Sequence, residues 1–153
     1  MDPVQKLLIA KAIEERLLDY WREVDENGGR QAGAYWTEDA VWEAPARAFK
    51  GRAEIQNFFD WRLTRGDRLA FHMVANLKTV VESETRASST WYLVLYAADG
   101  KPIQPSNAPA QIAAIDDRWS RSGDGPWLCQ HRKFKVLFES GAALAGPAAG
   151  QKS

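Results

Sequence analysis

Residues 69–138 contain four long segments in which apolar and polar residues alternate, and this pattern limits the possible folds more than any other feature. The alternation predicts strands over residues 69–82, 85–97, 110–122 and 126–138. Turn-forming residues, such as those of "SGDGPW", separate these segments, and short turns join antiparallel neighbours. We therefore expect four consecutive strands to form an antiparallel sheet.

The residues before these strands have the spacing of helices. Apolar side chains predict one helix over residues 3–27 and a second over about residues 51–65. Between them, "RQAGAYW" favours a short helix and "TEDAVWEAP" a short strand. Helices followed by long strands predict an α+β fold, in which a cone-shaped, curved antiparallel sheet wraps around the N-terminal helices. The inside of such a cone is a natural ligand site.

The length of 153 residues fits one domain, which we place at residues 1–140. Residues 141–153 are small and of low complexity, and we expect them to form a flexible tail.

Composition limits the class of partner. Lysine plus arginine equals aspartate plus glutamate, at 20 each, so neither nucleic acid nor a membrane is expected as a partner. A small hydrophobic substrate fits better. The sequence lacks an apolar run of signal-peptide or membrane-spanning length and has a single cysteine, Cys129, so we expect a cytoplasmic protein. Two scattered histidines and one cysteine predict no metal site, and no cofactor motif is present.

One histidine stands among apolar residues of the first long strand, "RLAFHMVANLKTVVES". Alternation places His72 and Asn76 on the same face as Val74. A buried imidazole needs a hydrogen-bond partner, and it can be a core group, a metal ligand or a proton-transfer group.

Other polar residues are predicted to face the interior. Asp25 and Tyr20 lie on opposite flanks of the apolar stripe of the first helix. Arg132 shares the inward parity of the last strand, which is costly unless it meets a carboxylate or a bound anion. A structural ion pair with Asp116 or Asp117 is one explanation for Arg132, whereas Cys129 is predicted to point away from the interior.

The combined sequence resembles the nuclear transport factor 2-like superfamily, in its SnoaL-like branch, over about residues 4–138. The resemblance rests on "YWREVDENGG", "AYWTEDAVWEAP" followed by "FKGRAEI", "FHMVANLKTV" and "DGPWLCQHRKF", in this order. Within this branch the chain is most similar to hexachlorocyclohexane dehydrochlorinases, scytalone dehydratases and bile acid 7α-dehydratases.

The resemblance implies a catalytic set. Asp25 matches an aspartate that orients a proton-abstracting histidine, and His72 matches that histidine. Arg132 matches the arginine with which dehydrochlorinases handle their leaving group. Tyr20 matches a tyrosine of the bile acid enzymes.

The chain also departs from each relative. Scytalone dehydratases use a second histidine where this chain has Trp91, Tyr92 and Tyr96, and the bile acid enzymes place an aspartate near Leu95. The substrate and the leaving group are therefore not carried over.

We expect a cofactor-independent lyase, similar to a dehydratase or a dehydrohalogenase, that acts on a small apolar aromatic or alicyclic substrate. An isomerase or cyclase using the same base is a close variant. The alternative class is non-catalytic: the small subunit of an aromatic-ring dioxygenase, or a ligand-binding module. The residues predicted to line the substrate pocket are Trp21, Trp42, Phe59, Asn76, Tyr92, Tyr96 and Phe134. Relatives assemble through the sheet, so a homodimer or homotrimer is expected.

Overall fold

The computed structural model describes residues 1–140, so the predicted tail at 141–153 lies outside the described residues. The elements, in chain order, are α1 (Pro3–Asn27), the short 3-10 helix η1 (Ala32–Tyr35), β1 (Trp36–Glu43), β2 (Ala48–Lys50), α2 (Arg52–Leu63), β3 (Arg68–Val81), β4 (Arg86–Asp99), β5 (Gln111–Ser120) and β6 (Leu128–Glu139). In the described part of the chain, no helix is long and apolar enough to cross a membrane.

The strands form one sheet with the order β2-β1-β6-β5-β4-β3. The strands β3 to β6 are antiparallel neighbours, which confirms the prediction for them. The sheet as a whole is mixed, because β1 pairs in parallel with β6. The sequence also gave no prediction for β2, which has only three residues. A parallel pair needs a long crossover, and here α2 and four strands, β2 to β5, separate β1 from β6 in the chain.

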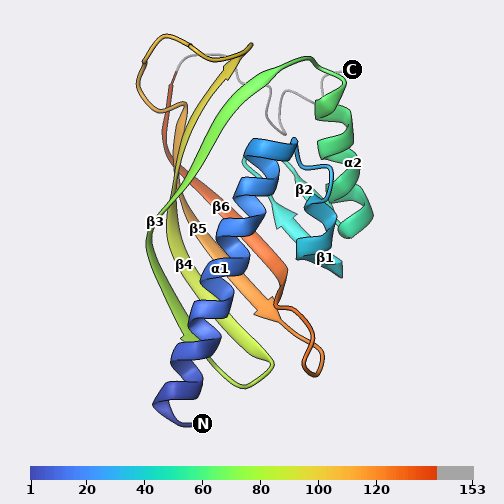
Figure 1. Cartoon of the computed structure of the whole chain (residues 1–153), viewed down its shortest axis with the longest axis vertical. Coiled ribbons are helices and arrows are strands. Elements are labelled where there is room, and N and C mark those ends of the chain that lie inside the picture. Colours follow the sequence, from blue (N-terminus) through green and yellow to red (C-terminus); the bar gives the residue numbers. More distant parts are fainter. Residues whose placement is uncertain (141–153) are drawn as a thin grey trace.

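The curved sheet wraps around α1, and α2 lies beside η1 and the short strands β1 and β2 (Figure 1). This arrangement confirms the predicted α+β cone. The helix α1 begins at a capping box, in which the Asp2 carboxylate accepts a hydrogen bond from the Gln5 backbone N–H at 2.9 Å. It ends at Gly28, whose φ of 67° is a left-handed conformation that glycine adopts without strain. The helix buries Ile9, Ile13, Leu17, Tyr20 and Trp21 against the sheet.

A bulge in β3 interrupts the predicted alternation of inward and outward side chains. The register with β4 shifts between Ala75 and Lys78, and Asn76 lies within the bulge with a φ of 54°. The extra residue turns the Asn76 side chain outward, where it is exposed. The prediction that Asn76 faces the interior beside His72 is therefore wrong.

A second register shift, between β5 and β6, changes the side of the sheet on which Cys129 was predicted to lie. The register shifts between Arg118 and Trp119, opposite the segment from Cys129 to His131. As a result Cys129 and Arg132 are both buried. The prediction that Cys129 points away from the interior is wrong for this reason.

Candidate active site

Asp25 and His72 form a closely bonded pair. The Asp25 Oδ1 atom lies 2.6 Å from His72 Nδ1, and Asp25 Oδ2 accepts a hydrogen bond of 2.9 Å from the His72 backbone N–H. The helix α1 supplies the aspartate near its C-terminus, and β3 supplies the histidine. Because the carboxylate bonds both the ring and the backbone of His72, it fixes the position of the imidazole.

This geometry determines which ring nitrogen can act. Nδ1 keeps its proton and donates a hydrogen bond to the carboxylate, so Nε2 carries the lone pair in the neutral ring. In residues 1–140, Nε2 has no hydrogen-bond partner, and the His72 side chain is 12% exposed. Burial lowers the pKa of His72 from 6.5, although the Asp25 carboxylate raises it in part. The imidazole is therefore neutral at pH 7, which is the form that accepts a proton.

We expect His72 to titrate with a midpoint below pH 6.5 in an NMR titration of the two histidine rings. The Asp25→Asn variant should lower the midpoint further, because Asp25 is the group that favours the charged ring. His131→Gln assigns the signals, since it removes the only other histidine. A His72 midpoint above 6.5, or one that rises in Asp25→Asn, would contradict this electrostatic account.

Trp21 covers one face of the imidazole. The two rings are stacked, with centroids 4.2 Å apart and planes 8° apart. Trp21 and Asp25 lie one turn apart on α1, so a single helix both covers and orients the histidine. The face of the imidazole that Trp21 covers is therefore closed to any ligand.

Arg132 lies in a buried ion pair and not at the surface of an open site. Its Nε donates to Asp117 Oδ1 at 2.7 Å and its Nη2 donates to Asp117 Oδ2 at 3.0 Å. Asp117 also accepts a hydrogen bond of 2.7 Å from Trp91 Nε1. The side chains of Arg132 and Asp117 are 1% and 0% exposed. Burial lowers the pKa of Arg132, but the Asp117 carboxylate outweighs this effect and the net pKa is raised, so the guanidinium stays charged.

Four aromatic rings surround this guanidinium. The rings of Tyr20, Trp21, Trp36 and Trp91 have their centroids 5.1 to 5.4 Å from Arg132 Cζ. Each of these distances permits a cation–π contact. Trp21 contacts both His72 and Arg132, so it lies between the Asp25–His72 pair and the Asp117–Arg132 ion pair.

Tyr20 is buried, 2% exposed, and its hydroxyl has no hydrogen-bond partner. Burial raises the pKa of Tyr20, while the Arg132 charge and the nearby Trp36 N–H, which lies outside hydrogen-bonding geometry, offset part of that rise. The phenol therefore remains protonated at physiological pH. It can donate a hydrogen bond or a proton, but it does not act as a base.

The predicted pocket residues fall into two groups. Trp42 and Phe59 are buried and stacked on each other at 6.1 Å, and the partly buried Phe134 packs 5.9 Å from Trp42, so these three face the core. Tyr92 and Tyr96 are 43% and 39% exposed and lie on the outer face of β4. The prediction that they line the pocket is wrong, because alternation gives the inner face of β4 to Trp91, Leu93 and Leu95.

Trp36 and Asp117 are the site residues that sequence reasoning missed or left undecided. Trp36 is fully buried at the start of β1, but the predicted strand began one residue later. Asp117 pairs across β5 and β6 with Arg132, and this register could not be derived from one strand alone.

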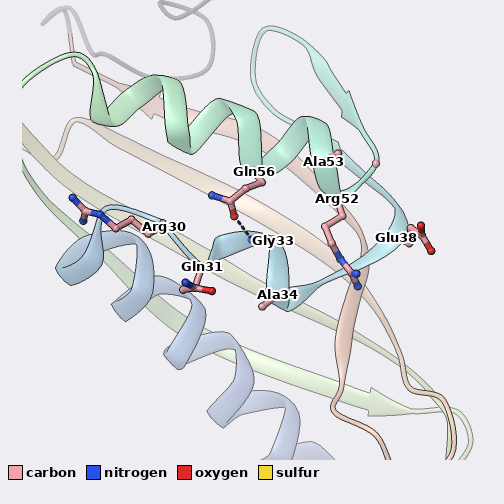
Figure 2. A pocket seen from close by; sticks show the side chains of 9 residues that line it. Arg30, Gln31, Gly33, Ala34, Glu38, Arg52, Ala53 and Gln56 are labelled. Atoms are coloured by element: carbon pink, nitrogen blue, oxygen red, sulfur yellow. Dashed lines mark hydrogen bonds between the residues drawn. The ribbon is translucent and has the colours of Figure 1, made fainter.

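A groove on the surface is a separate feature (Figure 2). It has a volume of about 510 Å³ and lies where η1 faces the start of α2. Gln56 crosses it and accepts a hydrogen bond of 2.7 Å from the Gly33 backbone N–H. The Arg52 guanidinium in its wall donates to the Trp36 backbone carbonyl at 2.9 Å. These side chains tie η1 to α2, and neither Asp25 nor His72 lines the groove.

Comparison with protein families identifies the chain. The model of the SnoaL-like domain matches residues 5–133. The chain belongs to the SnoaL-like domain family. The predicted resemblance to SnoaL-like proteins is thereby confirmed. No curated protein sequence matches the chain.

Solved structures share the SnoaL-like fold. A candidate scytalone dehydratase from Novosphingobium aromaticivorans is 20% identical, with a TM-score of 0.76 and 90% of each chain covered. A nuclear transport factor 2-like protein with a cystatin-like fold, from the same species, is 18% identical at a TM-score of 0.68, covering 86% of this chain and 83% of that one. ActVI-ORFA from Streptomyces coelicolor is 16% identical at a TM-score of 0.70, covering 84% and 97%.

The SnoaL-like fold and family support a general role as an enzyme of the SnoaL type or as a ligand-binding protein. At sequence identities of 20% or less, these structures show a shared fold and do not indicate the substrate of this chain.

Proposed function

We propose that this SnoaL-like protein is a cofactor-independent lyase, in which His72 removes a proton from a carbon atom of the substrate so that a leaving group departs. The observation that carries the proposal is the 2.6 Å contact of Asp25 Oδ1 with His72 Nδ1, which leaves Nε2 without a partner in the described chain. An aspartate in this position stabilises the imidazolium that forms when the base takes a proton.

The substrate is proposed to be small and apolar, aromatic or alicyclic. The interior side chains that would contact it are aromatic, namely Trp21, Trp42, Phe59 and Phe134. Tyr20 is the proposed acid or hydrogen-bond donor, because its phenol stays protonated. Arg132 would contribute through Nη1, since Asp117 already occupies Nε and Nη2.

An isomerase or cyclase would need the same base, and the dyad supports it equally at the first step. A ligand-binding module or a dioxygenase small subunit would need no aspartate–histidine pair, so the dyad favours catalysis over these alternatives.

A substrate screen tests the proposal. Small aromatic and alicyclic β-hydroxy ketones and halides are incubated with the wild-type protein, and elimination products are measured. Products that form at a rate proportional to protein concentration would support a lyase, whereas rearranged products of unchanged composition would support an isomerase. Saturable binding without any product would favour the ligand-binding alternative.

The outer face of the sheet supports the proposed homo-oligomer. Register places Met73, Val94, Ile112 and Phe138 in one row across the strands β3 to β6. Phe138 is 68% exposed in this row, and neighbouring Phe71 is 60% exposed. An apolar surface of this continuity commonly marks a protein interface.

We expect light scattering to give two or three times the mass of one chain. The double variant Met73→Lys and Val94→Lys should shift the protein to monomer, because it places two charges in this apolar row. Leu8→Lys is the matched control, since Leu8 is an exposed apolar residue of α1 outside the sheet. A monomeric wild type, or an unchanged mass in the double variant, would contradict assembly through this face.

A further inference from the structure

Several buried polar atoms around Arg132 lack hydrogen-bond partners. In the described chain these are Tyr20 Oη, Arg132 Nη1, Trp21 Nε1 and Trp36 Nε1. Buried polar groups are nearly always bonded to protein or to an ordered molecule. Four unpartnered groups on residues in contact with one another therefore indicate a missing partner.

The ring contacts bring these groups together. Tyr20 packs edge-on against Trp21 at 4.7 Å and against Trp36 at 5.8 Å. All three rings lie within 5.4 Å of the Arg132 guanidinium carbon. Tyr20 and Trp21 come from α1, Arg132 comes from β6, and Trp36 comes from the start of β1. We call these four residues the donor cluster.

The chemistry of the donor cluster limits what can occupy it. Indole and guanidinium groups have only N–H donors, so the Tyr20 hydroxyl is the one group that can also accept. A water molecule brings two hydrogens of its own, and the cluster offers it too few acceptors. A group with lone pairs and no hydrogen satisfies the donors better.

The charge of the cluster is also limiting. Asp117 neutralises Arg132 through two hydrogen bonds, so the cluster has no net charge with which to attract a buried anion. A neutral acceptor atom, such as a carbonyl oxygen, avoids the cost of burying a charge.

We infer that the donor cluster binds a neutral hydrogen-bond acceptor without a hydrogen, of the type of a carbonyl oxygen, and that Trp36 and Trp21 contact it through their indole N–H groups. The inference extends the proposed function, because this acceptor is a part of the substrate whose proton His72 removes. Trp21 contacts both the cluster and His72, so the proposed acceptor site and the base are neighbours across a single ring.

NMR signals of the indole N–H groups test the inference in the wild-type protein. Trp91 and Trp119 serve as internal references, because their indoles donate to Asp117 at 2.7 Å and to Ser89 at 2.8 Å. Before ligand is added, the Trp21 and Trp36 signals should lie upfield of these two. Cyclohexanone should move both signals downfield, whereas cyclohexanol, which brings a hydrogen of its own, should move them less.

Variants give a second, independent measurement. Tyr20→Phe removes the hydroxyl and keeps the ring, whereas Trp36→Phe replaces the indole by a smaller ring without an N–H donor. Each variant should weaken cyclohexanone binding about two- to tenfold. Trp127→Phe is the matched control, because Trp127 Nε1 is also buried and unpartnered but the ring packs on Arg121 instead. It should leave binding unchanged.

The results separate this inference from the proposed function, because the indole shifts require no turnover. Indole shifts without elimination would refute the lyase and uphold the acceptor site. Elimination without indole shifts would refute the acceptor site and uphold the lyase. Two results would overturn the acceptor site. The Trp21 and Trp36 signals could already lie at hydrogen-bonded positions in the free protein, or they could stay fixed at a saturating concentration of cyclohexanone.

Discussion

The His72→Gln variant is expected to lose about 10²- to 10⁴-fold in the rate of elimination, which is the usual contribution of a positioned general base. Glutamine keeps a polar side chain of similar reach, so it preserves the contact with Asp25 but provides no basic nitrogen. The loss should appear in kcat, because the base acts in the transition state and not in substrate binding. Steady-state kinetics on any substrate found in the screen measures it.

Two variants serve as controls for this result. His131→Gln removes a histidine that pairs with Glu43 at 2.7 Å and is one-third exposed, and it should leave the rate unchanged. Asp25→Asn should reduce the rate less than His72→Gln does, since the base itself remains. A His72→Gln variant with full activity would remove His72 from the mechanism.

Replacement of Asp117 by alanine should destabilise the protein by about 3 to 5 kcal/mol, because it leaves the buried Arg132 guanidinium without a counter-charge. Trp91 Nε1 would lose its acceptor in the same variant. Urea denaturation monitored by tryptophan fluorescence measures the change in the free energy of unfolding. Asp116→Ala is the matched control, since Asp116 is the exposed neighbour on the same strand, and it should change stability by less than about 0.5 kcal/mol.

The double variant Arg132→Met with Asp117→Leu distinguishes charge burial from simple loss of packing. Apolar replacement of both partners of a buried ion pair is often neutral or stabilising, so the double variant should recover most of the stability that Asp117→Ala loses. If it is less stable than Asp117→Ala, the main effect of Asp117 is packing and the electrostatic explanation is wrong.

Much of the fold follows from local sequence. The alternation in residues 69–138 correctly predicted four antiparallel strands, since each pairs with a neighbour through a turn or a loop. The parallel contact of β1 with β6 could not be predicted, because no local signal relates segments so far apart in the chain.

Bulges explain the misplaced side chains. A bulge adds one residue and reverses the inward face beyond it, and nothing in "FHMVANL" shows where the bulge occurs. Asn76 is the residue within that bulge, and it has a left-handed backbone. Asparagine tolerates this conformation better than most residues, which is the one signal that the sequence contains.

The sequence predicted the partner of His72 but left the partner of Arg132 open. The structure brings Asp25 and His72 together as predicted, because α1, which carries Asp25, packs against β3, which carries His72. It places Arg132 in the structural ion pair that the sequence left open between Asp116 and Asp117, and Asp117 is the partner.

Deuterium exchange tests most directly whether His72 removes a proton from carbon. The probe is 2-tetralone, a fused aromatic and alicyclic ketone with acidic C–H bonds, incubated in heavy water at neutral pH and examined by mass spectrometry. The account predicts that the wild-type protein and His131→Gln accelerate deuterium incorporation, while His72→Gln gives only the rate of the buffer. Equal incorporation with His72→Gln and the wild type, or no acceleration by the wild type, would contradict it.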